Sequence, residues 1–160
     1  MKSDRIYKAY RADTIGRLIT NLKKKGKKIV FTNGVFDILH YGHVNYLSRA
    51  REMGDVLIVG LNCDSSVRKF KPAERPIQHE TDRAKILAAL RSVDYVVMFS
   101  EETPEKLIKA IKPNILVKGA DYKLNQIVGA DFVKSYGGQV RRIRIAKGRS
   151  SSKIIKKLNL

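Results

Sequence analysis

The chain has 160 residues, a single cysteine and a formal net charge of +18 at pH 7. This length suits one domain with a core of its own, and one cysteine excludes an internal disulfide. The polar start and the lack of a long apolar run predict neither a signal peptide nor a membrane span, so we expect a cytoplasmic protein that does not bind membranes.

The excess of Lys and Arg favours an anionic substrate or partner. A non-catalytic, basic nucleic-acid-binding protein is one alternative. However, the basic residues are spread along the chain, and no helix-turn-helix, finger or aromatic ribonucleoprotein motif accompanies them, so we expect no specific nucleic-acid partner. The lysines at 23–28 also fit the end of a helix that Asp13 caps and Gly26 terminates.

Apolar runs and helical patterns alternate along the chain. The runs predict buried parallel strands at 28–31, 56–60, 95–99, 115–117 and 140–145. Helical spacing predicts helices at 43–53, 81–90, 104–111 and about 126–136. This alternation predicts a Rossmann-like α/β fold, a doubly wound parallel sheet of about five strands with helices on both faces. We expect a single domain over 1–160, with an N-terminal helical extension at 1–26 and the core at 27–158.

Ligands of such sheets bind at the carboxyl ends of the strands. This rule brings the loops at 32–43, 62–76, 118–123 and 147–152 to one rim of the sheet. The long polar segment 69–79 lies within this region and has the length and proline content of a lid over a site.

The first of these loops, TNGVFDILHYGH at 32–43, has the features of a phosphate-binding turn. Gly34 frees the backbone after the strand, and Gly42 removes a Cβ where a ligand approaches. His40 and His43 are three apart and share one helical face. A zinc site is an alternative, but no cysteine or second histidine cluster completes four ligands, so we predict no metal ligands. A packed pair in the core is the other alternative.

The chain contains neither GxGxxG after the first strand nor the GxxxxGK phosphate loop. HxGH, preceded by GxFDxxH, resembles the signature of the nucleotidyltransferase superfamily that includes the cytidylyltransferases. From about residue 27 to 158 the chain resembles one subgroup, the bacterial D-glycero-β-D-manno-heptose 1-phosphate adenylyltransferases. The matching segments include FTNGVFDILHYGHVNYL, VGLNCDSSVRKFK, RPIQHETDRAKILAAL, LVKGADYK and GRSSSKIIKKL.

The resemblance implies transfer of the adenylyl group of ATP to heptose 1-phosphate, giving ADP-heptose and pyrophosphate for the lipopolysaccharide core or another surface glycan. A phosphomonoester is already dianionic near neutral pH, its second pKa being about 6, so the attack needs no strong base. The protein must align two polyanions and neutralise growing charge instead. The resemblance also implies Mg²⁺ held mainly by phosphates and a homodimer or higher homo-oligomer. Many proteins of this subgroup carry a sugar kinase domain before the transferase, but only about 26 residues stand there in this sequence, so we expect a separate sugar kinase to supply the substrate.

The resemblance assigns roles to individual residues. It makes His40, His43 and Lys71 catalytic, with His43 nearer the α-phosphate. It assigns Arg83 and Lys69 to the sugar phosphate. The expected nucleotide-binding residues are Thr32, Asn33, Gly34, Phe36, Asp37, Gly42, Lys118, Gly119, Asp121, Ser150, Ser151 and Ser152.

Several of these residues also have purely structural interpretations. Asp37 precedes a helix and could cap it, and one of the serines could do the same for the last helix. Lys69 and Lys71 could be solvated charges, and Arg83 could form a surface ion pair. A cytidylyltransferase for glycerol- or ethanolamine-phosphate is the rival function, against which Ala120 weighs, because many such enzymes have an acidic residue there.

Overall fold

The computed structural model describes residues 3–8, 12–72, 74–144 and 151–157. Its elements are η1 (Ser3–Arg5), β1 (Ile6–Lys8), α1 (Ala12–Lys24), β2 (Ile29–Gly34), α2 (Tyr41–Arg51), β3 (Val56–Asn62), α3 (Asp64–Val67), α4 (Glu80–Ala89), β4 (Tyr95–Phe99), α5 (Glu105–Ile111), β5 (Ile115–Gly119), η2 (Leu124–Gln126), α6 (Ala130–Ser135), β6 (Gln139–Ile143) and α7 (Ser151–Lys157). None of these helices is both long and apolar enough to cross a membrane.

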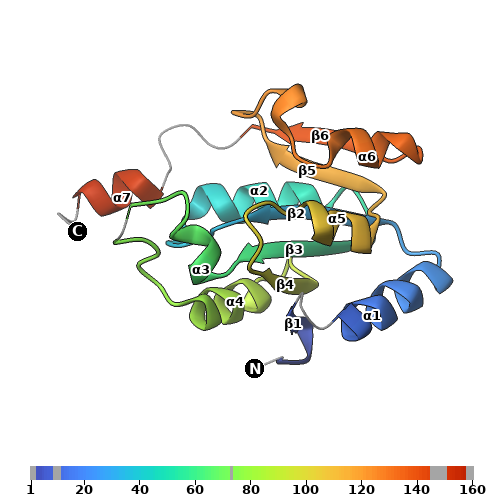
Figure 1. Ribbon diagram of the computed structural model, residues 1–160, viewed down its shortest axis with the longest axis horizontal. Coiled ribbons are helices and arrows are strands. Elements are labelled where there is room, and N and C mark those ends of the chain that lie inside the picture. The colour runs from blue at the N-terminus through green and yellow to red at the C-terminus, as the bar shows by residue number, and fades with distance from the viewer. Residues whose placement is uncertain (1–2, 9–11, 73, 145–150, 158–160) are drawn as a thin grey trace.

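The strands form a six-stranded sheet in the order β1-β4-β3-β2-β5-β6, and every neighbouring pair is parallel. Side chains of a strand alternate between the two faces of its sheet. Along β2, Val30 therefore joins a core with residues of α2 and α4, whereas Ile29 and Phe31 join a second core with residues of α1, α5 and α6. Helices thus cover both faces, which confirms the predicted Rossmann-like α/β architecture (Figure 1).

The direction of winding reverses beside β2. The chain passes from β2 to β3 and β4 on one side, and then returns to the other side of β2 for β5 and β6. The carboxyl ends of β2 and β5 therefore diverge into loops that leave in opposite directions, which opens a crevice between them. The loops and short helices at this edge, with α3 and α7, lie on the left in Figure 1.

The N-terminal segment differs from the predicted helical extension, because it contributes a sixth strand. Ile6 pairs with Val96 of β4, and the ring of Tyr7 lies edge-to-face with Tyr95 at 5.9 Å. A strand of three residues has no periodicity of its own, so its place depends on the tertiary contact with β4. Helix α1 begins at Ala12, one residue before the expected cap.

The predicted helix at 126–136 is also shorter than expected. Gly129 has a φ of 81° and separates η2 from α6, and Gly137 with a φ of 85° ends α6. Left-handed backbone is accessible to glycine at little cost, which explains why the segment breaks there.

A central glycine provides a test of the packing between β2 and β3. A Cβ on Gly60 would lie 2.8 Å from Phe31 Cζ and 3.1 Å from Asn33 Cβ, so Gly60→Ala should lower the free energy of unfolding by about 1–3 kcal/mol. Gly16 of α1 has no atom within 4 Å of its Cβ position, so Gly16→Ala should raise it by about 0.5–1 kcal/mol. Urea unfolding of both variants measures the difference, and equal effects would contradict the packing described.

Candidate active site

A cleft of about 530 Å³ lies at the carboxyl edge, where the chain changes its direction of winding. Ten of the residues predicted from the sequence line it: Asn33, Gly34, Phe36, Asp37, His40, His43, Lys71, Lys118, Asp121 and Ser151. They come from the ends of β2 and β5 and the loops that follow, from the start of α2, from the lid segment and from the start of α7. The expected convergence of distant loops on one rim therefore holds for these residues.

The two histidines lie at the start of α2, with His40 as its N-cap residue. Their rings stack with centroids 3.9 Å apart and planes 23° from parallel, and the Phe36 ring packs edge-to-face on His43 at 5.2 Å. The pKa of His43 is lowered to about 4, mainly by burial and also by the neighbouring His40, while a backbone hydrogen bond at Ile38 opposes both effects. His43 is therefore neutral at pH 7, and a neutral imidazole has one N–H to offer as a donor.

Two buried polar atoms beside these rings have no hydrogen-bond partner among the described residues. They are Asn33 Oδ1 and His43 Nδ1. Buried polar atoms are normally paired, so both are expected to gain a partner when ligand or water occupies the cleft.

Lys118 lies near the end of β5, and its side chain lines the same cleft. Its ammonium donates to the backbone carbonyl of Asn33 at 3.3 Å and lies 5.4 Å from the centre of the Tyr122 ring. Burial lowers the pKa of Lys118 to about 8, and the nearby Asp121 partly opposes this shift. The ammonium group is thus partly desolvated and held between β2 and β5, where the charge of a bound phosphate would balance its own.

Asp37 holds the lid segment against the turn after β2. Its Oδ2 accepts from Arg75 Nε at 2.5 Å and from the Ile77 backbone N–H at 3.0 Å, and its Oδ1 accepts from the Gln78 N–H at 3.0 Å. The carboxylate is 1% exposed. Both oxygens are engaged, so Asp37 anchors the lid, and its contact with the nucleotide stays a prediction.

The guanidinium of Arg83 is buried in the protein. It donates to the carbonyls of Gln78, Val35 and Asn62, and its Nη2 lies 2.6 Å from Asp64 Oδ1. Its side chain has no exposed area and does not line the cleft. Arg83 therefore connects the loops after β2 and β3 with the lid, and its binding of the sugar phosphate stays a prediction.

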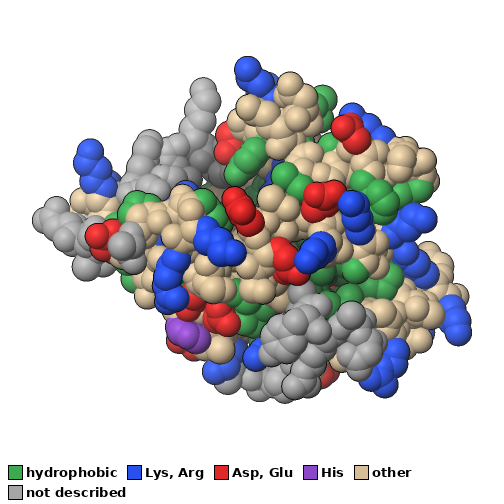
Figure 2. Space-filling model, in the orientation of Figure 1, with side chains coloured by type: hydrophobic (Ala, Val, Ile, Leu, Met, Phe, Trp, Pro, Cys, Tyr) green, Lys and Arg blue, Asp and Glu red, His purple; other side chains and the backbone are tan. Residues whose placement is uncertain are grey.

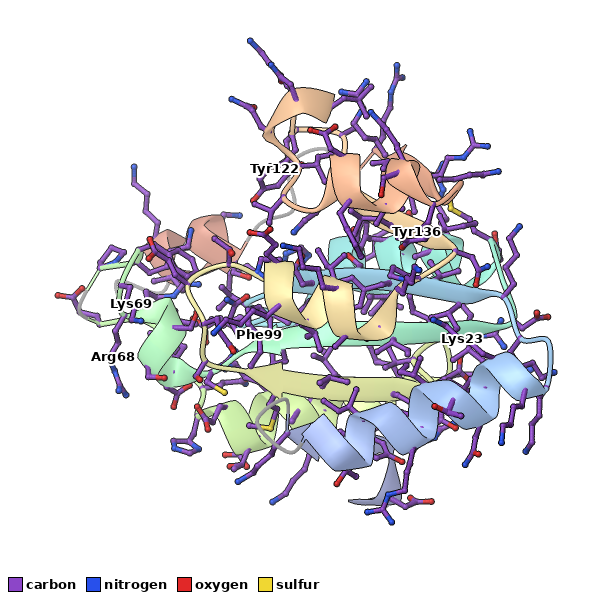
Figure 3. The ribbon with its side chains drawn as sticks, turned by 45° about the vertical axis from the view of Figure 1, so that its right-hand side comes forward. Lys23, Arg68, Lys69, Phe99, Tyr122 and Tyr136 are labelled. Atoms are coloured by element: carbon purple, nitrogen blue, oxygen red, sulfur yellow. The ribbon has the colours of Figure 1, made fainter. Side chains whose placement is uncertain are left out.

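Four other predicted residues do not line the cleft. Thr32 is fully buried and its hydroxyl lies 2.7 Å from the Tyr46 hydroxyl, so it joins β2 to α2. Gly42 in α2 and Gly119 at the end of β5 are both buried. Lys69 is exposed and lies at the outer edge beside α3 (Figure 3).

The serine segment is only partly described. Ser151 begins α7, lines the cleft and donates from its hydroxyl to the Ile38 carbonyl at 2.9 Å. This bond joins α7 to the turn that carries the histidines. Ser150 and the side chain of Ser152 lie outside the described residues.

The cleft also contains residues that sequence reasoning did not select: Val35, Asn62, Phe70, Arg75, Glu102, Pro104 and Tyr122. Phe70 and Arg75 belong to the expected lid, and Tyr122 to the expected loop after β5. Glu102 and Pro104 follow β4, whose loop was not included in the predicted rim. Arg75 donates to Asp37 through Nε alone. Among the described residues its two terminal nitrogens have no acceptor, so they can donate to a phosphate.

The chain is similar to known proteins in sequence and in fold. Residues 31–157 match the cytidylyltransferase-like family model. The bifunctional protein HldE of Citrifermentans bemidjiense is 52% identical over 91% of this chain and 30% of its own length, and HldE of Geobacter metallireducens is 51% identical over 98% and 32%. A solved lipopolysaccharide core biosynthesis protein from Thermoplasma volcanium is similar with a TM-score of 0.62 at 32% identity, over 78% of this chain and all of that one. The chain spans about 30% of the curated relatives' length.

The placement of Arg83 predicts that its removal affects folding. Arg83→Met leaves Asp64, which is 8% exposed, as an uncompensated buried charge, so the free energy of unfolding should fall by about 3–5 kcal/mol. Urea unfolding measures this, with Arg68→Met on the exposed side of α3 as the control. Unchanged stability combined with a raised KM for the sugar phosphate would instead identify Arg83 as a direct ligand.

Proposed function

This chain belongs to the cytidylyltransferase-like family, and on that basis we propose that it transfers the adenylyl group of ATP to D-glycero-β-D-manno-heptose 1-phosphate. The products are ADP-heptose and pyrophosphate, and the ADP-heptose serves the lipopolysaccharide core or another surface glycan. The identity of about half with HldE proteins over nearly the whole chain supports this assignment. The observation that carries it is the stacked His40–His43 pair in one cleft with Lys118, at the crevice between β2 and β5.

In the proposed reaction a phosphate oxygen of the sugar phosphate attacks the α-phosphorus of ATP. A new P–O bond forms, and the bond from the α-phosphorus to the bridging oxygen breaks, so that pyrophosphate leaves with the bonding electrons. The attacking oxygen is already ionised, which removes the need for a base. The neutral His43 and its neighbour His40 donate N–H groups to the phosphates, while Lys118 and the positive end of α2 stabilise the growing negative charge.

The acceptor phosphate is assigned to the side of the cleft that the lid forms. Lys71 and Arg75 line this side, and Arg75 is held by Asp37 through one nitrogen only. A planar guanidinium with its terminal nitrogens free suits bidentate binding of a phosphate. In this proposal Arg75 takes the role that the family resemblance assigned to Arg83.

Mg²⁺ fits this cleft as an ion held mainly by the phosphates of ATP. Asp121 and Glu102 line the cleft, but no cluster of three potential ligands occurs in the ranges that the structure describes. Mg²⁺ commonly uses one or two carboxylates together with substrate phosphates. When bound, it neutralises phosphate charge. The supply of substrate by a sugar kinase, the homo-oligomeric state and the cytoplasmic location are parts of the proposal that rest on family resemblance.

A pyrophosphate-release screen tests the substrates directly. The screen crosses ATP and CTP with heptose 1-phosphate anomers, glycerol 3-phosphate and phosphoethanolamine, and we expect turnover with ATP and the β-anomer. In the same assay His43→Ala should lower kcat by ~10²–10³ because it removes a preorganised donor. His79→Ala, which removes an imidazole whose side chain is 64% exposed outside the cleft, is the matched control. Turnover with CTP and an alcohol phosphate alone would assign the rival cytidylyltransferase function.

The depressed pKa of Lys118 predicts a pH dependence. Below about pH 8 the ammonium is charged and binds the phosphates, and above this value it loses its proton. Since kcat/KM reports groups of the free enzyme, kcat/KM for ATP should fall as the pH rises through about 8. Lys118→Arg keeps its charge, so its decline should move to higher pH. An identical alkaline limb in both proteins would show that another group causes it.

A further inference from the structure

A second basic hollow lies at the amino ends of the strands, at the opposite edge of the sheet from the cleft. Two adjoining depressions of about 370 and 200 Å³ share Lys28, Asn114 and Tyr136. Lys23, Gly26, Lys27 and Lys112 complete the larger one, and Gly137, Gly138 and Gln139 complete the smaller one. The two depressions together are called the lysine hollow below. Figure 3 shows Lys23 and Tyr136 on the same side of the sheet, away from Lys69, and blue side chains project along this right-hand edge in Figure 2.

All charged side chains that line the lysine hollow are positive. None of its four lysine side chains forms an ion pair within the described part of the chain, and neither depression is lined by a carboxylate. The carboxylate of Asp55 lies nearby but accepts from the backbone N–H of Lys28 at 2.8 Å. The cleft described above, in contrast, includes Asp37, Glu102 and Asp121. The lysine hollow therefore attracts anions without a competing internal acid.

The negative ends of nearby helices neutralise only part of the positive charge of this lysine cluster. The carboxyl ends of α1, α5 and α6 converge here, and each carries roughly half a negative charge. Three such ends offset about one and a half charges, against four ammonium groups. Burial lowers the pKa of Lys23, and repulsion from Lys112 lowers it further. A bound anion would relieve this repulsion.

The polar groups of the lysine hollow are held in place by the fold. Asn114 Oδ1 accepts from the Ile29 backbone N–H at 2.8 Å, which fixes the side-chain amide and leaves its Nδ2 without an acceptor in the described ranges. Lys112 has a φ of 51°, and its ammonium lies 5.1 Å from the centre of the Tyr136 ring. The Tyr136 hydroxyl donates to the Pro113 carbonyl at 2.8 Å. One amide donor and one lysine are thus positioned before any ligand binds.

We propose that the lysine hollow binds a short phosphate chain, a di- or triphosphate anion, at a site separate from the cleft. Several closely spaced ammonium groups favour a multiply charged ligand over a single carboxylate. The larger depression is near the lower end of small-ligand sites, which range from about 300 to 1,000 Å³. β2 separates this site from the cleft by roughly 15–20 Å, because Lys28 precedes the strand and Gly34 ends it.

Titration of the ¹⁵N-labelled full chain with sodium tripolyphosphate at low salt tests this proposal. The backbone amides of Gly26, Gly137 and Gly138 line the lysine hollow, whereas those of Gly34 and Gly42 report on the cleft. We expect saturable shifts of the first group, with an affinity at least about tenfold weaker in the double variant Lys23→Gln/Lys112→Gln. Both lysines are exposed, so the variant should keep the wild-type spectrum without ligand.

The control Lys85→Gln/Arg91→Gln removes the same charge from exposed positions in and after α4, and its affinity should stay within about twofold of wild type. The proposal is overturned if only the cleft amides shift, or if both double variants weaken binding equally. It is also overturned if a single-stranded oligonucleotide shifts the Gly26 and Gly137 amides when tripolyphosphate does not. Adenylyl transfer by Lys23→Gln/Lys112→Gln should match wild type, which separates this site from the proposed reaction.

Discussion

The arrangement of the cleft depends on the buried guanidinium of Arg83, because this one group holds three segments that are far apart in the sequence. Its hydrogen bonds reach the turn after β2 at Val35, the end of β3 at Asn62 and the lid at Gln78. The ion pair with Asp64 supplies the charge that makes burial possible, since an unpaired guanidinium would be costly there. Asp37 adds a second attachment by binding the lid at Arg75, Ile77 and Gln78.

This fixed rim has an electrostatic consequence for the chemistry. Groups that are already positioned and partly desolvated stabilise developing charge without reorganising during the reaction. His43 is kept neutral and Lys118 is kept close to its titration point, both mainly by burial. The two therefore differ in charge at pH 7, with one N–H donor and one cation facing the same crevice. A polyanionic substrate would raise both pKa values, because negative charge favours their protonated forms.

Much of the fold follows from local patterns. The apolar runs predict β2 to β6, and the rule for parallel sheets brings their loops to one rim. β1 was missed because a three-residue strand is defined by its pairing with β4. The direction of an arginine side chain was also missed, although Arg83 lies four residues before Leu87 in the buried stripe of α4. Helical spacing thus contained a signal for burial, whereas the contact of Arg75 with Asp37 depends on a loop whose path no periodicity describes.

A crystal structure with α,β-methylene-ATP and heptose 1-phosphate would show where both substrates bind in the cleft. We expect an α-phosphate between the histidines of α2 and Lys118, the sugar phosphate at Lys71 and Arg75, and the bonds of Arg83 to Val35, Asn62 and Asp64 unchanged. A guanidinium of Arg83 turned into the cleft to bind the sugar phosphate, or a triphosphate bound away from the β2–β5 crevice, would contradict this expectation.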